Sequence, residues 1–174
     1  MPTTEATVAP RLVTQRLVLR QLEARDFEPF AEQFTSAEAM APLSPLADRR
    51  AAWQKLASLV GMWTLSNAGW WGVELRETNE LAGTVGAFFR ESGGDLEIGW
   101  TVFPRFRRRG IAVEAARAAL AHGFSTHNAV TRAIAHVDAP NIASVRVCES
   151  LGMSLEGDVD FYGTRLMRYA IARV

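Results

Sequence analysis

The hydrophobic pattern of the first third of the chain predicts one strand and two helices. Apolar residues alternate over 16–22, the period of a half-buried strand. Over 27–34 they recur at helical spacing behind Asp26, a residue suited to an N-cap. The same spacing returns over 47–65, and the Asn67–Gly69 stretch is suited to end that helix.

The middle of the chain predicts three consecutive strands, over residues 70–76, 81–89 and 96–103. Short polar or glycine-rich stretches at 78–80 and 91–95 separate them and are typical of turns. Strands joined by such short connections pair antiparallel. We therefore expect an antiparallel meander in the centre of the fold.

The last third alternates helices with strands. We predict helices over 110–126 and 141–151 and strands over 132–137, 155–160 and 166–172. The fold class is then mixed α/β: a mostly antiparallel sheet of about seven strands with helices on both faces. We expect a flexible N-terminal tail over residues 1–10 and a single domain over 11–174.

Composition narrows the function classes. The chain has 174 residues, 48% of them hydrophobic, and equal numbers of basic and acidic side chains (19 each), so it has no general attraction to nucleic acid. Cys148 is the single cysteine, which excludes an internal disulfide and fits a reducing compartment. With no signal peptide and no apolar run near ~20 residues, we expect a cytoplasmic protein that does not bind membranes.

The richest motif is the stretch 97–112, where a buried strand enters a four-arginine turn and then an alanine-rich helix. The pattern Arg107-x-x-Gly110-x-Ala112 places a glycine at the helix N-terminus. Free backbone N–H groups and the positive end of the helix dipole favour a phosphate there. A solvated basic turn and an RNA-binding patch are the alternatives; the Walker and dinucleotide glycine motifs are absent.

A second motif follows at 138–153. Asn141 stands after a proline and before a helix, where an N-cap is expected, and Gly152 is suited to the helix C-cap. Taken alone, both residues therefore have ordinary structural explanations.

Together, the motifs resemble the GNAT superfamily of N-acetyltransferases, and within it the RimJ/RimL-type branch of ribosomal-protein alanine acetyltransferases. The resemblance extends from Arg16 to Ile171. It is carried by Thr14-x-Arg16-Leu17-x-Leu19-Arg20, by Leu81–Gly86, by Glu97-Ile98-Gly99-Trp100, by the Arg107–Ala112 turn, by Asn141-x-x-Ser144 and by Glu149–Met153. Met153 replaces the aromatic residue usual in the family.

The resemblance implies a GNAT fold that binds acetyl-CoA where its sheet splays, with no metal. It implies that strand backbone at Trp100, Thr101 and Val102 pairs with the pantetheine arm. Backbone amides of the turn would hold the pyrophosphate, from Arg108, Arg109, Gly110, Ile111, Ala112 and Val113. Asn141 would bind the pantetheine, and Ser144 would lie near the thioester sulfur.

Acetyl transfer to an amine requires an acceptor for the amine proton. Glu97 is the first candidate, because strand alternation turns it away from Leu96 and Ile98 and a buried glutamate needs a cleft or a partner. The resemblance also places a catalytic glutamate on this strand. The alternative is a carboxylate paired with an arginine. His136 is expected to line the core or the cleft, and the three histidines lack metal-ligand spacing.

The departing thiolate needs a proton. The resemblance suggests Ser144; Cys148, at the position of a tyrosine in other branches, and Tyr162 are the alternatives. Trp53, Trp63, Trp70 and Trp71 are expected mostly in the core, with a share of them lining the acceptor pocket beside Phe34 and Met40.

We therefore expect an N-acetyltransferase that uses direct attack in a ternary complex. The expected acceptor is a protein N-terminal amine, whose ordinary pKa near ~8 leaves it neutral more often than a lysine at ~10.4. A small amine such as an amino acid, polyamine or antibiotic is the alternative. A non-catalytic acyl-CoA-binding module is the alternative from another class. Either a monomer or a homodimer fits the sequence.

Overall fold

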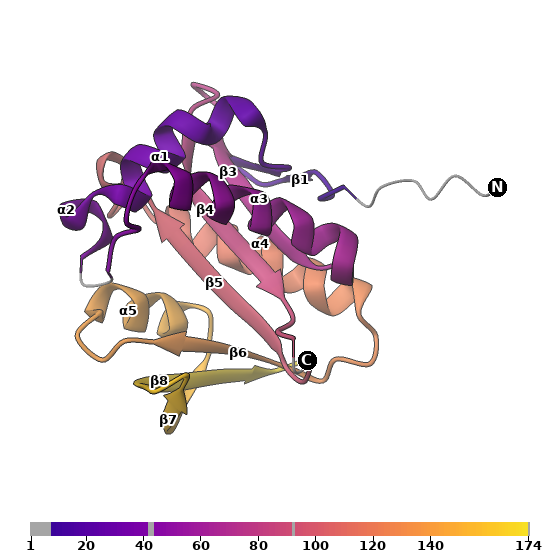
Figure 1. Cartoon of the computed structure of the whole chain (residues 1–174). Coiled ribbons are helices and arrows are strands. Elements are labelled where there is room, and N and C mark those ends of the chain that lie inside the picture. The colour runs from indigo at the N-terminus through magenta and orange to yellow at the C-terminus, as the bar shows by residue number, and fades with distance from the viewer. Residues whose placement is uncertain (1–7, 42–43, 92, 174) are drawn as a thin grey trace.

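A computed structural model describes residues 8–41, 44–91 and 93–173 (Figure 1). Its centre is an eight-stranded sheet in the order β1-β2-β3-β4-β5-β6-β8-β7. All neighbouring strands are antiparallel except β5 and β6, which are parallel. In the described part of the chain, no helix has the length and apolar character needed to cross a membrane.

The first half of the chain forms one edge of the sheet and the helices that cover it. Helices α1 and α3 pack on each other, and α3 packs on β3, on one face of the sheet. Asp48 caps α3, because its carboxylate accepts a hydrogen bond from Ala51 N, and Asn67 ends it in a left-handed conformation. The elements are β1 (Leu12–Val13), β2 (Leu17–Arg20), the 3₁₀ turn η1 (Ala24–Asp26), α1 (Phe27–Thr35), α2 (Ala37–Met40), α3 (Arg49–Ser66), β3 (Gly69–Leu75) and β4 (Leu81–Phe88).

The second half supplies the other edge and the opposite face. Helix α4 packs on β4 and β5 behind the sheet as drawn in Figure 1, and Gly123 lies where a larger residue would strike Leu96 of β5. The elements are β5 (Leu96–Val102), the 3₁₀ turn η2 (Pro104–Phe106), α4 (Ile111–Thr126), β6 (Arg132–Val137), α5 (Ile142–Ser150), β7 (Ser154–Phe161) and β8 (Thr164–Ala172).

The fold class and the central β3-β4-β5 meander are confirmed. The sheet has one strand more than the seven expected, because the two residues of β1 pair with β2. The turn predicted at 91–95 falls partly outside the described residues, as does most of the tail expected over 1–10. At the described end of that tail Ala9 is buried, and Pro10 O accepts a hydrogen bond from the indole of Trp71.

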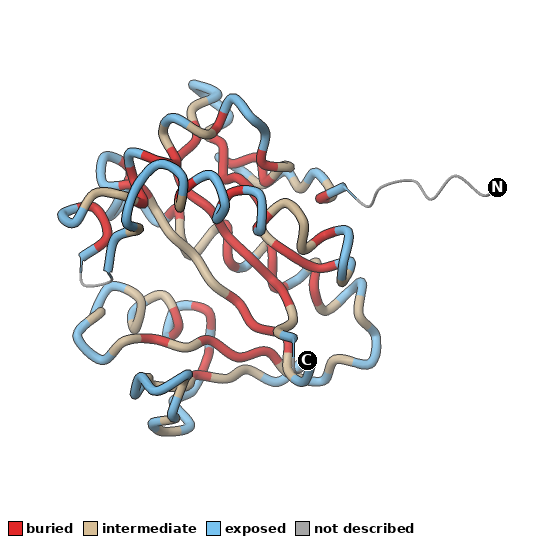
Figure 2. The backbone as a smooth tube through the Cα atoms, viewed as in Figure 1, coloured by how far each residue is buried: buried red, intermediate tan, exposed pale blue. Residues whose placement is uncertain are grey.

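Strands β5 and β6 separate almost as soon as they meet. Only Leu96 with Ala133 and Glu97 with Ile134 are in register, although β5 continues to Val102 and β6 to Val137. Figure 1 shows the two strands diverging toward α5. Along β5 the residues change from buried to half-buried at Gly99, visible as a change from red to tan in Figure 2. The sheet is therefore split, and the apex of the split is at Glu97.

A buried ion network fixes the first helix to the sheet. Arg20 of β2 donates to both carboxylate oxygens of Asp26, at 2.8 and 2.9 Å, and to Glu74 of β3 at 2.6 Å. The Asp26 carboxylate, followed by that of Glu74, raises the pKa of Arg20 against the effect of burial. Asp26 does stand at the N-cap position of α1, as predicted, but its side chain makes no cap hydrogen bond. It binds Arg20 and the backbone N–H of Glu23 instead.

We predict that Arg20→Ala lowers the free energy of unfolding by about 3–5 kcal/mol at neutral pH, because it leaves two buried carboxylates without their cation. Urea titration followed by circular dichroism measures the change. Arg25 is the matched control, since it reaches the same Glu74 at 3.8 Å but is 61% exposed. Arg25→Ala is expected to cost less than about 1 kcal/mol. Equal effects of the two substitutions would contradict a structural role for the network.

Candidate active site

A cavity of about 450 Å³ fills the mouth of the split. Its walls are the diverging end of β5, the start of α4, the first half of α5 and helix α2. Ten of the eleven residues expected to bind a cofactor line it: Trp100, Thr101, Val102, Arg108, Gly110, Ile111, Ala112, Val113, Asn141 and Ser144. Arg109 does not line it. The sequence motifs, which are up to 44 residues apart (100 to 144), thus meet in one space.

The basic turn presents bare backbone amides to this cavity. Gly110 is the N-cap of α4 with φ of 74° and supplies no side-chain cap, in contrast to the capped helices α3 and α5. Arg108, two residues earlier, also has a positive φ, of 61°. Backbone that alternates in this way turns successive N–H groups toward one point and forms an anion-binding nest. The N-terminus of α4 is therefore suited to a phosphate group.

A polar brace from the N-terminal motif holds this turn in place. Arg16 donates from Nη1 to the carbonyl oxygen of Arg109 at 2.8 Å and from Nε to Glu114 at 2.7 Å. Glu114, in the first turn of α4, also accepts from the Thr14 hydroxyl at 2.6 Å and from the backbone N–H of Arg16 at 2.9 Å. A Cβ at Gly110 would lie 3.3 Å from the Arg16 guanidinium. The Thr14-x-Arg16 motif therefore has a physical role: it fixes the backbone at residues 109 and 110.

Two arginines of the cavity were not among the predicted site residues. Arg107 lines it and donates to the carbonyl oxygens of Val102, at 3.0 Å, and of Ala39. The guanidinium thus ties the end of β5 to helix α2. Arg146 of α5 lines the cavity from the other side. Its position in α5, four residues before the helix ends, carries no sequence signal of this role.

Asn141 and Ser144 begin helix α5 on the opposite wall. The Asn141 side chain caps the helix, because its Oδ1 accepts from the Ser144 backbone N–H at 3.1 Å. The amide nitrogen of Asn141 makes no hydrogen bond within the described chain. The ordinary structural explanation of Asn141 is thus confirmed, and its NH₂ group remains able to donate to a ligand.

Glu97 lies at the apex of the split and not in the wall of the cavity. It is 6% exposed and accepts two hydrogen bonds from Arg90, at 2.6 and 2.7 Å. His136 of β6 stands on the same face, with its Nδ1 3.3 Å from Oε1 of Glu97. The structure therefore shows the arginine pairing that was one of the two explanations for a buried glutamate on this strand, and adds a histidine to it.

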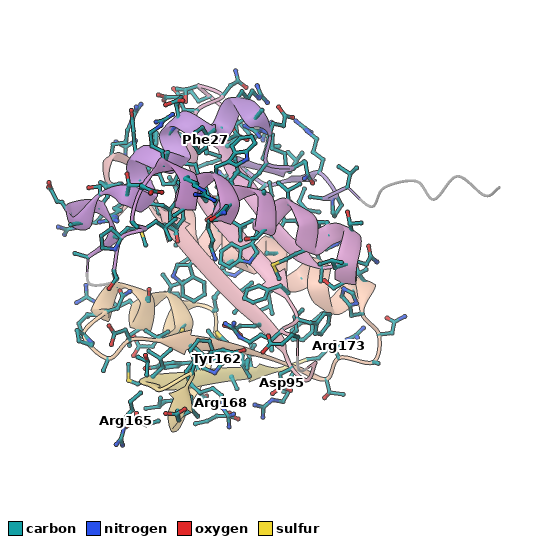
Figure 3. The ribbon with its side chains drawn as sticks, viewed as in Figure 1. Phe27, Asp95, Tyr162, Arg165, Arg168 and Arg173 are labelled. Atoms are coloured by element: carbon teal, nitrogen blue, oxygen red, sulfur yellow. The ribbon has the colours of Figure 1, made fainter. Side chains whose placement is uncertain are left out.

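The three candidate proton donors lie in different surroundings. Ser144 lines the cavity. Cys148 is fully buried in α5, and burial raises the pKa of its thiol to about 12. Tyr162 is 69% exposed, donates its hydroxyl proton to Glu91, and has its pKa raised first by that carboxylate. Figure 3 places Tyr162 with Arg168 in the region of the β7–β8 hairpin.

Of the residues expected to form the acceptor pocket, only Met40 lines the cavity, and none of the four tryptophans among them does. Trp63 and Trp71 are buried, whereas Trp53 is half exposed. Trp70 stacks on Phe88 at 5.2 Å and lies in a slot over two glycines, because a Cβ at Gly86 or Gly99 would be 2.5 or 2.8 Å from its indole. Met40 lines the cavity, and Phe34 is buried. Within residues 8–41, 44–91 and 93–173, no three histidine, cysteine, aspartate or glutamate side chains are grouped to hold a metal ion.

Residues 16–154 match the acetyltransferase (GNAT) domain family. The chain belongs to the GNAT acetyltransferases. It is 32% identical over 149 residues to the uncharacterized N-acetyltransferase YnaD of Bacillus subtilis, with 84% of each chain covered. The family match over residues 16–154 includes all the residues that line the cavity. We conclude that the protein is an N-acetyltransferase.

Solved GNAT structures share the whole architecture. An acetyltransferase from Agrobacterium tumefaciens superposes with a TM-score of 0.84 at 27% identity, covering 94% of this chain and 95% of the other. RimL, a ribosomal α-N-protein acetyltransferase solved in complex with coenzyme A, superposes with a TM-score of 0.71 at 16% identity, covering 92% and 96%. The second similarity is one of fold.

We predict that Cys148 is inert in the folded protein. With a pKa of about 12, only about one thiol in 10⁴ is ionised at pH 8, and the side chain is also shielded from reagents. A chromogenic disulfide reagent at pH 8 is expected to react at least about 10³-fold more slowly with native than with urea-unfolded protein. Since the chain has one cysteine, the signal is unambiguous. Rapid native labelling would restore Cys148 as a candidate acid.

Proposed function

We propose that this enzyme binds acetyl-CoA in the split between β5 and β6 and transfers the acetyl group to a primary amine by direct attack in a ternary complex. One observation carries the proposal: the uncapped N-terminus of α4 opens on a cavity that continues along the unpaired edge of β5. A phosphate at one end and an amide-rich arm along the other match these two features.

The residues of the cavity then have distinct tasks. The pantetheine arm pairs with the backbone of Trp100, Thr101 and Val102, which pairs with β4 on its other side. The pyrophosphate accepts hydrogen bonds from amides of the turn, residues 108–113. The Asn141 side-chain NH₂ donates to the pantetheine while its Oδ1 caps α5. Arg146 and the basic turn add positive charge around the phosphates.

Proton transfer involves two groups. Glu97 takes part in removing the proton from the amine, at the apex of the split. Ser144 protonates the thiolate, because of the three candidates it alone lines the cavity. Neither step needs a covalent acyl-enzyme. The Cys148 thiol is buried and protonated, and no serine is bonded to a histidine across the cavity in the part of the chain described here.

The acceptor we propose is the N-terminal amine of a protein. The sequence resembles the RimJ/RimL-type branch, and the fold superposes on RimL, whose acceptor is such an amine. A small amine such as an amino acid, polyamine or antibiotic is the alternative acceptor. The enzyme works as a monomer or homodimer in the cytoplasm, where acetyl-CoA and nascent N-termini are both present.

Calorimetric titration with acetyl-CoA tests the cofactor. We expect micromolar binding to the native chain and its loss in Gly110→Trp, because that residue has φ of 74° and faces the cavity. Gly163→Trp is the matched control: Gly163 has φ of 81°, with no atom within 4 Å of an added Cβ, and does not line the cavity. Absence of binding to the native chain would overturn the proposed function.

Removal of the brace provides a subtler test of the same site. We expect Glu114→Ala to raise the Kd for acetyl-CoA about 5- to 10-fold, or ~1–1.4 kcal/mol, because Arg16 then no longer fixes the Arg109 carbonyl. Glu80→Ala is the control, since Glu80 pairs with Arg105 of the same basic turn outside the cavity. Equal affinities of the two variants would show that the brace does not shape the phosphate site.

Thiol release identifies the acceptor. Peptides with N-terminal serine or alanine form one arm of the screen; free amino acids, spermidine and an aminoglycoside form the other. Each peptide is also supplied with an acetylated N-terminus and an internal lysine, so that α-amine and lysine transfer are separated. Turnover with the free peptides supports the protein-N-terminal acceptor, and turnover only with small amines favours the alternative. Binding of acetyl-CoA without turnover in either arm would favour a non-catalytic acyl-CoA-binding module.

A further inference from the structure

The apex of the split holds a chain of polar side chains from three elements. Arg90 follows β4, Glu97 is in β5 and His136 is in β6. Glu97 pairs with Ile134 in register, so His136, two residues further along β6, projects from the same face of the sheet as Glu97. The Arg90–Glu97 hydrogen bonds are 2.6 and 2.7 Å, and the Glu97–His136 approach is 3.3 Å.

Arg90 is held in place by aromatic rings and by the Glu97 carboxylate. Its guanidinium lies over the rings of Phe88, Phe161 and Tyr162, at 5.6, 4.4 and 5.9 Å from their centroids. Burial opposes its charge, but the Glu97 carboxylate raises its pKa. A carboxylate that accepts two hydrogen bonds from a caged cation has few lone pairs left for a substrate proton. Glu97 is therefore better suited to orient a neighbouring side chain than to accept the substrate proton itself.

His136 is the neighbour that Glu97 can orient. Its side chain is 11% exposed, and its ring packs against Phe161 with centroids 4.6 Å apart. Nδ1 is buried and points to the Glu97 side, yet it lacks a well-aligned hydrogen bond within the described residues. Catalytic hydrogen bonds are often misaligned before substrate binds and tighten with it. A small rotation of the ring would complete the Nδ1–H bond to Oε1 and leave Nε2 as a free acceptor.

We propose that His136 is the catalytic base of this acetyltransferase and that Glu97 is its positioning residue. The inference rests on the proposed function, in which Glu97 takes part in removing the amine proton. Here Glu97 does so by orienting His136. A neutral imidazole has one nitrogen that donates and one that accepts, so a ring held with its Nδ1–H toward Glu97 can take the amine proton on Nε2. The arrangement follows the logic of a base held in one tautomer by a carboxylate.

The step balances in atoms and charge. The neutral amine nitrogen forms a bond to the thioester carbonyl carbon, and the amine proton passes to Nε2 of His136. The C–S bond then breaks with its electron pair on sulfur. Ser144 passes a proton to the thiolate, and the proton held by the imidazolium leaves to solvent as the serine recovers its own. The products are the amide and free coenzyme A.

Other titratable groups lie around this ring and its neighbours. Arg168 of β8 is the register partner of His136, and its charge is bound by Glu156 at 2.8 Å. Tyr162 stands at the tip of the β7–β8 hairpin beyond Phe161. Lys55 of α3 lies near Arg90, and burial followed by the Arg90 cation lowers the pKa of its ammonium. The Glu97 carboxylate is thus the one anion within salt-bridge distance of His136 in the described residues.

His136→Gln tests the base. With acetyl-CoA and the best acceptor of the thiol-release screen, we expect kcat/KM to fall about 10²-fold or more and the acid limb of kcat, measured at saturating acceptor, to disappear, while the Kd for acetyl-CoA changes less than about twofold. His127→Gln is the matched control, because His127 also packs on a phenylalanine ring, at 5.0 Å from Phe89, but has no carboxylate within salt-bridge distance in the described residues, whereas His136 has Glu97. Full activity with an unchanged acid limb in His136→Gln would overturn the proposal.

Glu97→Gln separates the two possible bases. If Glu97 positions His136, the acid limb of kcat persists in Glu97→Gln and kcat falls about 10-fold, because the ring is no longer held in one tautomer. If Glu97 is itself the base, the acid limb vanishes in Glu97→Gln and survives in His136→Gln, which overturns the proposal.

A measurement without an acceptor keeps this inference separate from the proposed function. In ¹⁵N-labelled protein at pH 8 we expect His136 to show a protonated Nδ1 and a bare Nε2, assigned by comparison with His136→Gln among the three histidines. A protonated Nε2, or the absence of a tautomer preference at His136, would overturn the inference even if acetyl transfer is observed. If acetyl-CoA does not bind in calorimetry, the proposed function fails by that result alone.

Discussion

The site depends on the short parallel pairing between strands β5 and β6. β5 and β6 meet at two register pairs and then part, so the backbone of β5 beyond Glu97 has a strand partner on the β4 side only. Backbone donors and acceptors at such an edge require partners. Within a sheet whose faces are covered by helices, the open edge faces a narrow space lined by α4 and α5 and accepts an extended, amide-containing ligand.

Polar contacts between distant segments hold the split open at a fixed width. The Arg16–Glu114 brace sets the turn before α4, Arg107 ties β5 to α2, and Arg117 of α4 donates to Ser150 O at the end of α5. At the apex, Arg90 joins β5 to the β7–β8 hairpin through Glu97 and Phe161. Each contact uses an arginine, whose planar guanidinium makes several directed hydrogen bonds at once. The four contacts therefore connect the elements that border the split.

Local pattern was enough to predict most elements and the glycine-containing turn before α4, whereas the other cofactor-site candidates came from the resemblance to the GNAT family. The strand over 132–137 has the bounds that its alternation indicated, and the helix predicted from Gly110 begins at Ile111. These features depend on side-chain period and on glycine conformation, which a sequence displays directly. Strand β1 was not predicted, because two residues are too few to show a period and only the partner strand defines them.

What could not be predicted depends on partners far apart in sequence. Nothing near Asp26 indicates that its carboxylate binds Arg20 rather than the helix, because the choice is made when β2 meets η1. The Arg90 side chain was not a candidate, since a turn arginine is ordinarily solvated. His136 comes within reach of Glu97 only through the register of β5 against β6. The candidate proton path is therefore a property of strand register, which composition and spacing do not encode.

The slot under Trp70 couples three positions on three neighbouring strands. The indole can lie flat there only while residues 86 and 99 have no side chain, because even a methyl group at either would overlap it. Conversely, replacing the indole by a small residue would leave a void above two glycines next to the apex of the split. A substitution at one of the three positions is thus strained until the others change. In evolutionary terms this part of the sheet varies as a unit or stays as it is, because the three positions are tied by one contact.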